Sequence, residues 1–292
     1  DTSFTGKDLL RTTLRANNYQ NSVFGGAGSA ALMDATNPSN VGTDGVALNR
    51  LFYQFPVGKG VTATFGAKVR QDDMLAMWPS VYPGDSILDL FTYGGAGGTY
   101  TLNLGGGAGI WYQKDGFSLS ANFVSNEVAA ENSGLGLDDL YTFTAQAGYA
   151  GSNWGVALAY TYSDLLGYYS NNGGLSAYWQ PSESGWVPSI SAGFGLGTDT
   201  ELSDNYSWMV GLQWADVAIK GNMLGMALGT SSNIGTRGIV ASDLPGDGTL
   251  AYELWYKFQV TDNISVTPAF FWVENEGFDD TYGGLVKTTF KF

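Results

Sequence analysis

The sequence of 292 residues contains no cysteine and no histidine. Without cysteine there are no disulfide bonds, thiolate metal sites or thiol catalysis. Without histidine there is no imidazole metal ligand, and the commonest general base is missing. An enzyme built from this sequence would depend on carboxylate, Lys, Tyr or Ser side chains alone. We therefore expect a protein that is not an enzyme and that binds no metal or cofactor.

Charged residues and long apolar segments are also scarce. Charged residues make up 14% of the chain, against about 25% in soluble globular proteins. No apolar run reaches the length of a membrane-spanning helix, which needs about 18 residues or more. The net charge of −14 argues against nucleic acid as a partner, because phosphates would be repelled. The sequence does not begin with a signal peptide, so we expect a processed chain or a fragment.

Alternation of apolar and polar residues recurs along the chain and predicts long β-strands. One face of these segments carries aromatic and aliphatic residues such as Phe65, Phe143 and Tyr256, and the other carries mainly Ser, Thr, Gly, Asn and Gln. A soluble β-sandwich also alternates, but its polar face should be rich in Lys and Glu. The composition of the two faces favours a membrane barrel. The clearest segments are VTATFGAKVR (61–70), FSLSANF (117–123), YTFTAQAGY (141–149) and LAYELWYKFQV (250–260).

The connections between these strands alternate in length. Short Gly-, Asn- and Asp-containing turns lie at 5–8, 58–60, 114–116, 151–153, 182–185 and 261–263. Longer loops lie at 20–44, 72–105, 126–138, 164–173, 198–204, 231–248 and 275–281. One rim of short turns and one of long loops predicts an all-β fold: a transmembrane, antiparallel, up-and-down β-barrel of the outer-membrane kind, occupying residues 1–292 as a single domain.

The number of strands predicts that the barrel begins upstream of residue 1. We count fifteen strands, of which the first, DTSF (1–4), is a stub. Bacterial barrels of this kind have an even number of strands, with both termini at the rim of short turns. We therefore expect 16 strands, with the first strand and part of the second missing upstream. A structure in which the stub lies directly beside the last strand would contradict this count.

Basic residues gather on the polar faces of neighbouring predicted strands. Turning an Arg towards lipid at mid-membrane costs about 2–4 kcal/mol, so these side chains should point into the lumen. The alternative is that some lie at strand ends and extend to the headgroups. The predicted basic wall consists of Arg11, Arg15, Arg50, Lys68, Arg70 and Lys287.

The segment 72–105 becomes the third long loop once the missing strand is counted. It is acidic and partly apolar, with Asp72, Asp73, Asp85 and Asp89 among aromatic residues. Folded inwards, it would narrow the lumen and face the basic wall, giving a transverse field that selects solutes by size and charge. The alternative is a surface loop packed on its own rim.

The opening DTSFTGKDLLRTTLRANN (1–18) and the terminal TTFKF (288–292) resemble cyanobacterial outer-membrane porins. This family has an S-layer-homology domain, a coiled coil and an OprB-type barrel, and it is also labelled as iron-uptake porins. The resemblance implies a homotrimer in the cell outer membrane that is anchored to peptidoglycan through an N-terminal domain absent from this sequence. It also implies passage mainly of small inorganic ions. We further expect contacts with outer-membrane lipids and lipopolysaccharide.

The sequence is compatible with three functions. The first is a passive diffusion porin for inorganic ions and small polar solutes. The second is a carbohydrate-selective porin with an aromatic stacking track that includes Trp255. The third is a barrel that serves as an envelope tether or an enzyme, which would not require a basic lumenal wall.

Overall fold

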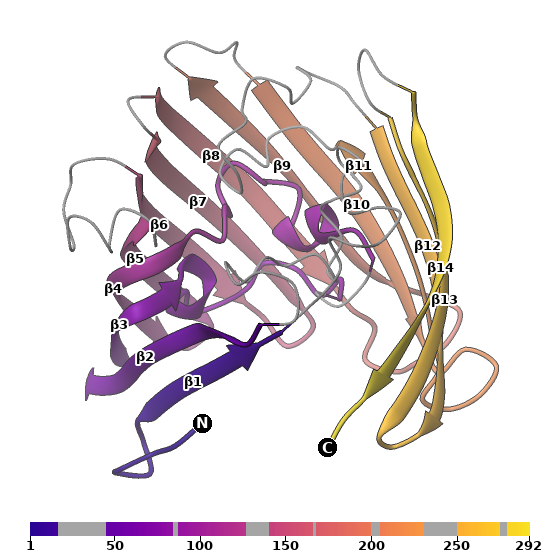
Figure 1. The fold of residues 1–292 in the computed structure, drawn as a ribbon, viewed down its shortest axis with the longest axis horizontal. Coiled ribbons are helices and arrows are strands. Elements are labelled where there is room, and N and C mark those ends of the chain that lie inside the picture. Colours follow the sequence, from indigo (N-terminus) through magenta and orange to yellow (C-terminus); the bar gives the residue numbers. More distant parts are fainter. Residues whose placement is uncertain are drawn as a thin grey trace.

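The computed structural model describes residues 1–16, 45–83, 87–126, 140–165, 168–199, 205–230, 250–274 and 279–292. Its strands form one antiparallel sheet in which each strand pairs with its neighbours in the sequence, from β1 to β14, and the sheet curves around a central space (Figure 1). The strands are β1 (Leu9–Arg15), β2 (Ala47–Gly58), β3 (Val61–Arg70), β4 (Leu104–Lys114), β5 (Phe117–Asn126), β6 (Tyr141–Ala150), β7 (Trp154–Leu165), β8 (Tyr168–Trp179), β9 (Ser189–Asp199), β10 (Asn205–Ala215), β11 (Met223–Thr230), β12 (Leu250–Thr261), β13 (Ile264–Val273) and β14 (Thr281–Phe290). The prediction of an all-β, up-and-down antiparallel fold is confirmed.

The two outermost strands of the described sheet, β1 and β14, do not pair with each other. The predicted stub forms a single antiparallel bridge with β1, in which the backbone N–H of Thr2 donates to the Leu10 carbonyl oxygen at 2.9 Å and that of Leu10 donates to the Thr2 carbonyl oxygen at 2.7 Å. The stub therefore lies beside β1 and not beside the last strand. The count of 16 strands stays a prediction.

Exposure is inverted relative to a soluble protein. Large apolar side chains on one face of the strands are exposed, including Phe65 at 54% and Phe143 at 43%. Polar side chains on the opposite face are buried, including Thr142 and Thr144, both at 0%. On the last strand, Val286 is 66% exposed, as the alternation predicts. This pattern is the one expected of a barrel whose outer surface meets lipid. No helix in the described ranges is long and apolar enough to cross a membrane.

The predicted long loop at 164–173 is largely strand. β7 extends to Leu165 and β8 begins at Tyr168, and the two strands are paired up to Leu165 opposite Tyr168. The Asn and Gly residues at 171–174 caused the error, since they were interpreted as loop residues. They instead lie in β8 opposite Ala159–Tyr162.

The predicted turn at 5–8 is organised by the carboxylate of Asp8. It accepts hydrogen bonds from the Thr5 backbone N–H at 2.7 Å, from the Ser3 hydroxyl at 2.7 Å and from the Tyr53 hydroxyl at 2.7 Å. The Thr5 hydroxyl also donates to it and is the main cause of an Asp8 pKa well below the ordinary value. The carboxylate therefore stays ionised and ties the N-terminal turn to β2.

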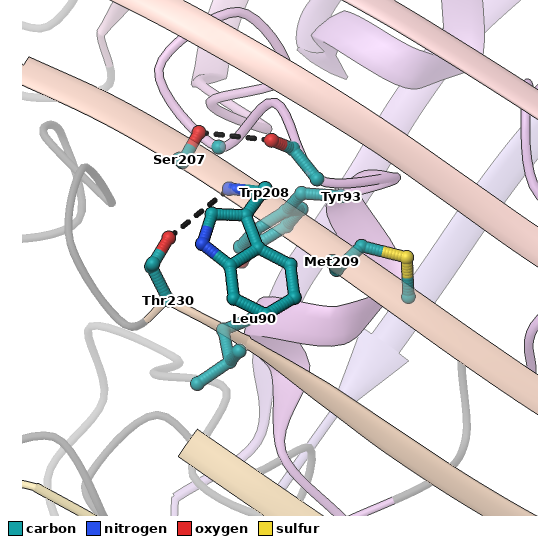
Figure 2. Close-up of a pocket in the computed structure, with 8 residues that line it drawn as sticks. Leu90, Tyr93, Ser207, Trp208, Met209 and Thr230 are labelled. Carbon is teal, nitrogen blue, oxygen red and sulfur yellow. Dashed lines mark hydrogen bonds between the residues drawn. The ribbon is translucent and has the colours of Figure 1, made fainter. Parts of the chain in front are cut away.

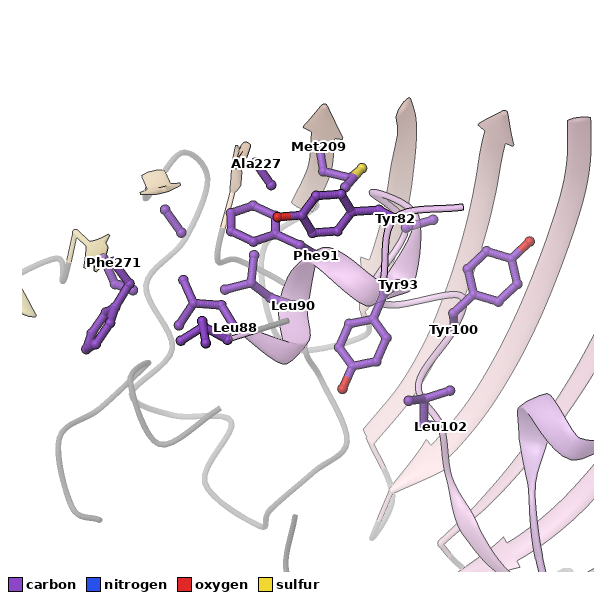
Figure 3. Packing of buried hydrophobic residues seen from close by; sticks show 14 of the residues in the cluster. Tyr82, Leu88, Leu90, Phe91, Tyr93, Tyr100, Leu102, Met209, Ala227 and Phe271 are labelled. Carbon is purple, nitrogen blue, oxygen red and sulfur yellow. The ribbon is translucent and has the colours of Figure 1, made fainter. Parts of the chain in front are cut away.

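The buried apolar residues lie between the sheet and the segment that joins β3 to β4. This segment, residues 71–103, is called the inner loop below and contains two short 3-10 helices, η4 (Gln71–Met74) and η5 (Asp89–Tyr93). Its side chains Tyr82 and Phe91 pack towards Met209 and Ala227 of the sheet (Figure 3). The inner loop therefore lies against the same face of the sheet that carries the buried hydroxyl and amide groups.

Candidate functional site

The inner loop begins with two Arg–Asp ion pairs at the end of β3. Arg50 of β2 donates through Nε to Oδ2 of Asp73 at 2.5 Å and through Nη1 to Oδ1 of Asn49 at 2.7 Å. Arg70 donates through Nε and Nη2 to the two carboxylate oxygens of Asp72. The backbone N–H of Arg70 also donates to Asp73 at 2.9 Å. These charge-assisted bonds fix the direction in which the chain leaves β3.

The arrangement of these charges differs from the one predicted from the sequence, which would produce a transverse field. In that prediction the acidic loop and the basic wall faced each other across the lumen. For these two pairs the charges are instead in contact, and the Arg50 and Asp73 side chains are only 7% and 11% exposed. Much of their field is therefore cancelled locally, and the pairs hold the loop on the wall.

The two adjacent carboxylates differ in their affinity for protons. Burial raises the pKa of Asp73, the neighbouring Asp72 carboxylate raises it further, and Arg50 only partly offsets these effects. Burial also acts to raise the pKa of Asp72, but the Arg70 guanidinium outweighs it and the pKa of Asp72 is lowered. As the pH falls, Asp73 therefore takes up a proton before Asp72 does.

Acidification should therefore shift ion selectivity. Protonation of Asp73 removes a negative charge from beside Arg50, so permeability should move towards anions as the pH falls through the raised pKa of Asp73. The shift should reverse on return to neutral pH. The measurement is the reversal potential in a KCl gradient between about pH 7 and about pH 4. In Asp73→Asn, which has no proton to gain, the acid-induced shift should be absent, and a shift of equal size there would assign it to another group.

A buried carboxylate on β12 holds the middle of the inner loop. Glu253 is 0% exposed. Its Oε1 accepts a hydrogen bond from the Tyr82 hydroxyl at 2.6 Å, and its Oε2 accepts from the backbone N–H groups of Ile87 at 3.2 Å and Leu88 at 2.6 Å. Burial and the Glu253 charge raise the pKa of Tyr82, so its hydroxyl stays protonated and donates. Trp255 completes the cluster by donating from Nε1 to the Tyr82 oxygen at 3.0 Å.

Glu253 was not predicted from the sequence as a site residue. Its signal was present, because it is a lone acidic residue on the polar face of a long strand rich in aromatic residues. A buried carboxylate needs a partner, and here the partners come from a loop more than 160 residues away in sequence.

Hydroxyl groups of several strands hold the rest of the inner loop. The Ser191 hydroxyl oxygen accepts hydrogen bonds from the backbone N–H groups of Val81 at 2.9 Å and Tyr82 at 3.0 Å. Farther along, the Ser176 and Ser207 hydroxyls donate to the carbonyl oxygens of Gly94 at 2.7 Å and Gly95 at 2.9 Å. The polar face predicted from alternation thus binds the backbone of the loop.

The contact near η5 leaves a small pocket. It is lined by Leu90 and Tyr93 of the loop and by Trp208, Met209 and Thr230 of β10 and β11, which are labelled in Figure 2. The backbone N–H of Trp208 donates to the Thr230 hydroxyl oxygen at 3.1 Å. This pocket is a packing space between loop and wall, and no charged residue lines it among those described.

Gly193 of β9 provides a test of how closely the loop approaches the sheet. A Cβ atom at this position would lie 1.8 Å from the Gly94 carbonyl oxygen. Gly193→Ala should therefore push the loop off the wall and destabilise the folded barrel by about 1–3 kcal/mol, as overpacking does. The measurement is the temperature at which the SDS-resistant folded band is lost. Gly173→Ala is the matched control, because a Cβ there meets no atom within 4 Å, and equal losses in both variants would contradict the close contact.

The remaining predicted basic residues occupy different environments. Arg11 pairs across the sheet with Phe52, which is buried on the inner side at 2% exposure, and its guanidinium binds Asp1 through two 2.9 Å hydrogen bonds. Arg15 pairs with the buried Ala47 on the same side. Lys287 lies on β14 opposite Thr267.

The prediction for Lys68 is corrected by the register. The pairing shifts between Gly66 and Val69, so strict alternation fails there. Val69, expected on the lipid face, is 0% exposed in a cluster with Phe52 and Met74. Lys68 lies opposite Leu51, whose neighbours Arg50 and Phe52 occupy the inner face, so Lys68 lies on the outer side.

The remaining predicted site residues are two acidic residues of the loop, Asp85 and Asp89, and the aromatic residue Trp255. Asp85 lies outside the described residues, as does the side chain of Asp89. Trp255 does lie on the inner face, but it is only 4% exposed because Tyr82 covers it, with ring centroids 6.3 Å apart. Its ring therefore presents no open face on which a sugar could stack.

The fold agrees with comparisons to known proteins. The family described as carbohydrate-selective porin, OprB family, matches residues 1–292. This chain belongs to the OprB family of porins. Among solved structures, OprB of Pseudomonas putida at high pH aligns with a TM-score of 0.57 and 12% identity, over 84% of this chain and 73% of that one. A variant of the Rh. blastica porin aligns with a TM-score of 0.54 and 14% identity, over 87% of this chain and 81% of that one.

Curated relatives of this OprB-family chain come from cyanobacteria. An uncharacterized protein of Nostoc sp. (strain PCC 7120) is 29% identical over 356 residues, covering 100% of this chain and 59% of that protein. An uncharacterized protein of Synechocystis sp. (strain PCC 6803) is 26% identical over 348 residues, covering 100% of this chain and 62% of that protein. The chain thus spans about three-fifths of the length of these relatives.

Proposed function

We propose that this OprB-family chain forms the barrel of an outer-membrane porin, a passive diffusion channel for inorganic ions and small polar solutes. The observation that carries the proposal is the inner loop, which lies on the polar face of the sheet and is anchored there by Glu253 and by strand hydroxyls. A loop held in this position narrows the passage. Selectivity then depends on the charges left on the surrounding wall, in the way that charged constrictions select ions.

The assembly and surroundings are also part of the proposal. We propose a homotrimer in the cell outer membrane, in contact with lipid and lipopolysaccharide, and attached to peptidoglycan through an N-terminal region upstream of residue 1. The exposed aromatic residues near strand ends support the membrane assignment. Tyr149 and Trp154, for example, are 42% and 43% exposed and lie 5.3 Å apart between ring centroids, as in the aromatic girdles at membrane interfaces.

Planar-bilayer conductance tests the proposal directly. The reconstituted protein should give an ohmic current that scales with salt concentration. The absence of current from folded, membrane-inserted protein would favour the tether hypothesis instead.

Arg11 and Arg15 should contribute to selectivity. Their replacement by Ser removes two positive charges from the inner side of β1, so the reversal potential in a KCl gradient should move towards cation selectivity. Lys7→Ser is the single-charge control, since Lys7 lies in the exposed turn before β1. An unchanged reversal potential in the Arg11→Ser/Arg15→Ser variant would remove this pair from the selective wall.

Passage of carbohydrates is the second candidate function, and membership of a family of carbohydrate-selective porins favours it. Since Tyr82 covers Trp255, a stacking track would have to use other aromatic residues. Addition of maltose or maltotriose to the bilayer chamber distinguishes the two functions. A saturable, sugar-dependent block of the ion current supports the carbohydrate channel, and a current unaffected by sugar supports the general ion porin.

A further inference from the structure

A second charged feature lies on the inner face of β12–β14, on the short-turn side of the inner loop. Along β12, Glu253 and Trp255 contact the loop, and Lys257 follows before the turn that leads to β13. On β14, Lys287 lies opposite Thr267 of β13. The register that sets Phe258 opposite Val266 places Lys257 level with Thr267. Lys257, Thr267 and Lys287 therefore form one row across three strands.

This row borders a pocket whose polar groups are complementary to an anion. Besides the two lysines, the lining includes the side chains of Ser265, Thr267 and Thr289, and Trp255 and Pro83 close its loop side. No carboxylate lines the pocket among the described residues. Ser265 and Thr267 are 5% and 6% exposed, so both side chains lie largely enclosed at the edge of the pocket.

The spacing of the two lysines along the row suits a small, multiply charged ion. Adjacent strands lie about 4.8 Å apart. Lys257 on β12 and Lys287 on β14 are separated by one strand, so their backbones lie about 10 Å apart. Lysine side chains are long and flexible enough for both ammonium groups to converge on one ion between them. A tetrahedral oxyanion also accepts hydrogen bonds from hydroxyl groups, whereas a neutral sugar carries no negative charge for the two ammonium groups to balance.

We propose that Lys257, Lys287 and the hydroxyls between them form a subsite for a small oxyanion such as inorganic phosphate, directly beside the constriction made by the inner loop. The subsite rests on the proposed channel function and deepens it by naming a solute class. An ion that dwells at the subsite occupies the passage, so phosphate should inhibit the chloride current in a saturable manner. Binding must remain weak enough for the ion to leave, as conduction requires.

The test measures chloride current through the reconstituted protein while inorganic phosphate is added at constant ionic strength. In the Lys257→Gln/Lys287→Gln variant, the half-inhibiting phosphate concentration should rise about tenfold or more. Lys114→Gln/Lys220→Gln is the matched control, with the same charge change at exposed positions, one at the end of β4 and one in the turn between β10 and β11, and it should behave like the unsubstituted protein. Absence of phosphate inhibition, or equal inhibition in the two double variants, would overturn the subsite.

A second measurement separates the subsite from the channel. The ³¹P linewidth of inorganic phosphate, recorded with folded protein in detergent, needs no current. Broadening that is lost in Lys257→Gln/Lys287→Gln but kept in the control supports the subsite even if no current flows, in which case only the channel function fails. A normal chloride current without phosphate inhibition or broadening leaves the channel in place and overturns the subsite.

Discussion

Glu253→Ala should release the inner loop from the wall and open the passage. The substitution leaves the backbone N–H groups of Ile87 and Leu88 and the hydroxyl of Tyr82 without the acceptor that they now share. A buried donor that is left without an acceptor costs about 1–3 kcal/mol. The loop therefore loses the anchor nearest its centre. Single-channel conductance should rise, with larger current fluctuations, and the folded barrel should melt at a lower temperature.

The chain offers two comparisons for this experiment. Glu253→Gln keeps an oxygen acceptor but turns an amide donor towards N–H donors, so its effect should be intermediate. Glu183→Gln changes an exposed residue in the connection between β8 and β9 and should leave the conductance unaltered. If Glu253→Ala conducts like the unsubstituted protein, the loop is held by other contacts or does not limit the current.

The sequence was sufficient to predict the strands because alternation reports which face is buried. That signal is local and strong where strands pair without interruption, as in β5 and β6. It failed at Val69 and Lys68, because a register shift adds one residue to β3 and moves the following side chains to the other face. It also failed at 171–174, where Asn and Gly occur inside a paired strand. Neither departure leaves a periodic trace in the sequence.

The site was less accessible from the sequence than the fold. An acidic loop and basic strands could be identified, but not which carboxylate meets which guanidinium. The pairs Arg50–Asp73 and Arg70–Asp72 depend on how η4 turns after β3, and that turn is fixed by contacts with strands distant in sequence. Glu253 shows the same limit, since its partners are backbone groups that carry no sequence signature.

Asp73→Asn should make the channel more selective for anions. Arg50 now lies 2.5 Å from the Asp73 carboxylate and is largely buried. The amide of Asn keeps the shape of the side chain but removes the charge that compensates the guanidinium, so a positive charge stands unbalanced at the start of the inner loop. The field of an uncompensated charge in a narrow passage attracts anions and repels cations. The reversal potential in a KCl gradient should therefore move towards the chloride equilibrium potential.

A charge-balanced double variant shows whether the pair acts as a unit. Arg50→Gln/Asp73→Asn removes both charges and should restore a reversal potential close to that of the unsubstituted protein, because the field of the closely paired charges is largely cancelled to begin with. The coupling between the two changes should be large, as it is for residues in direct contact. Asp115→Asn, in the exposed turn between β4 and β5, supplies the control for loss of a carboxylate far from the inner loop. If Asp73→Asn shifts the reversal potential no further than Asp115→Asn does, the Arg50–Asp73 pair anchors the loop without setting the charge of the passage. Selectivity would then arise elsewhere on the wall.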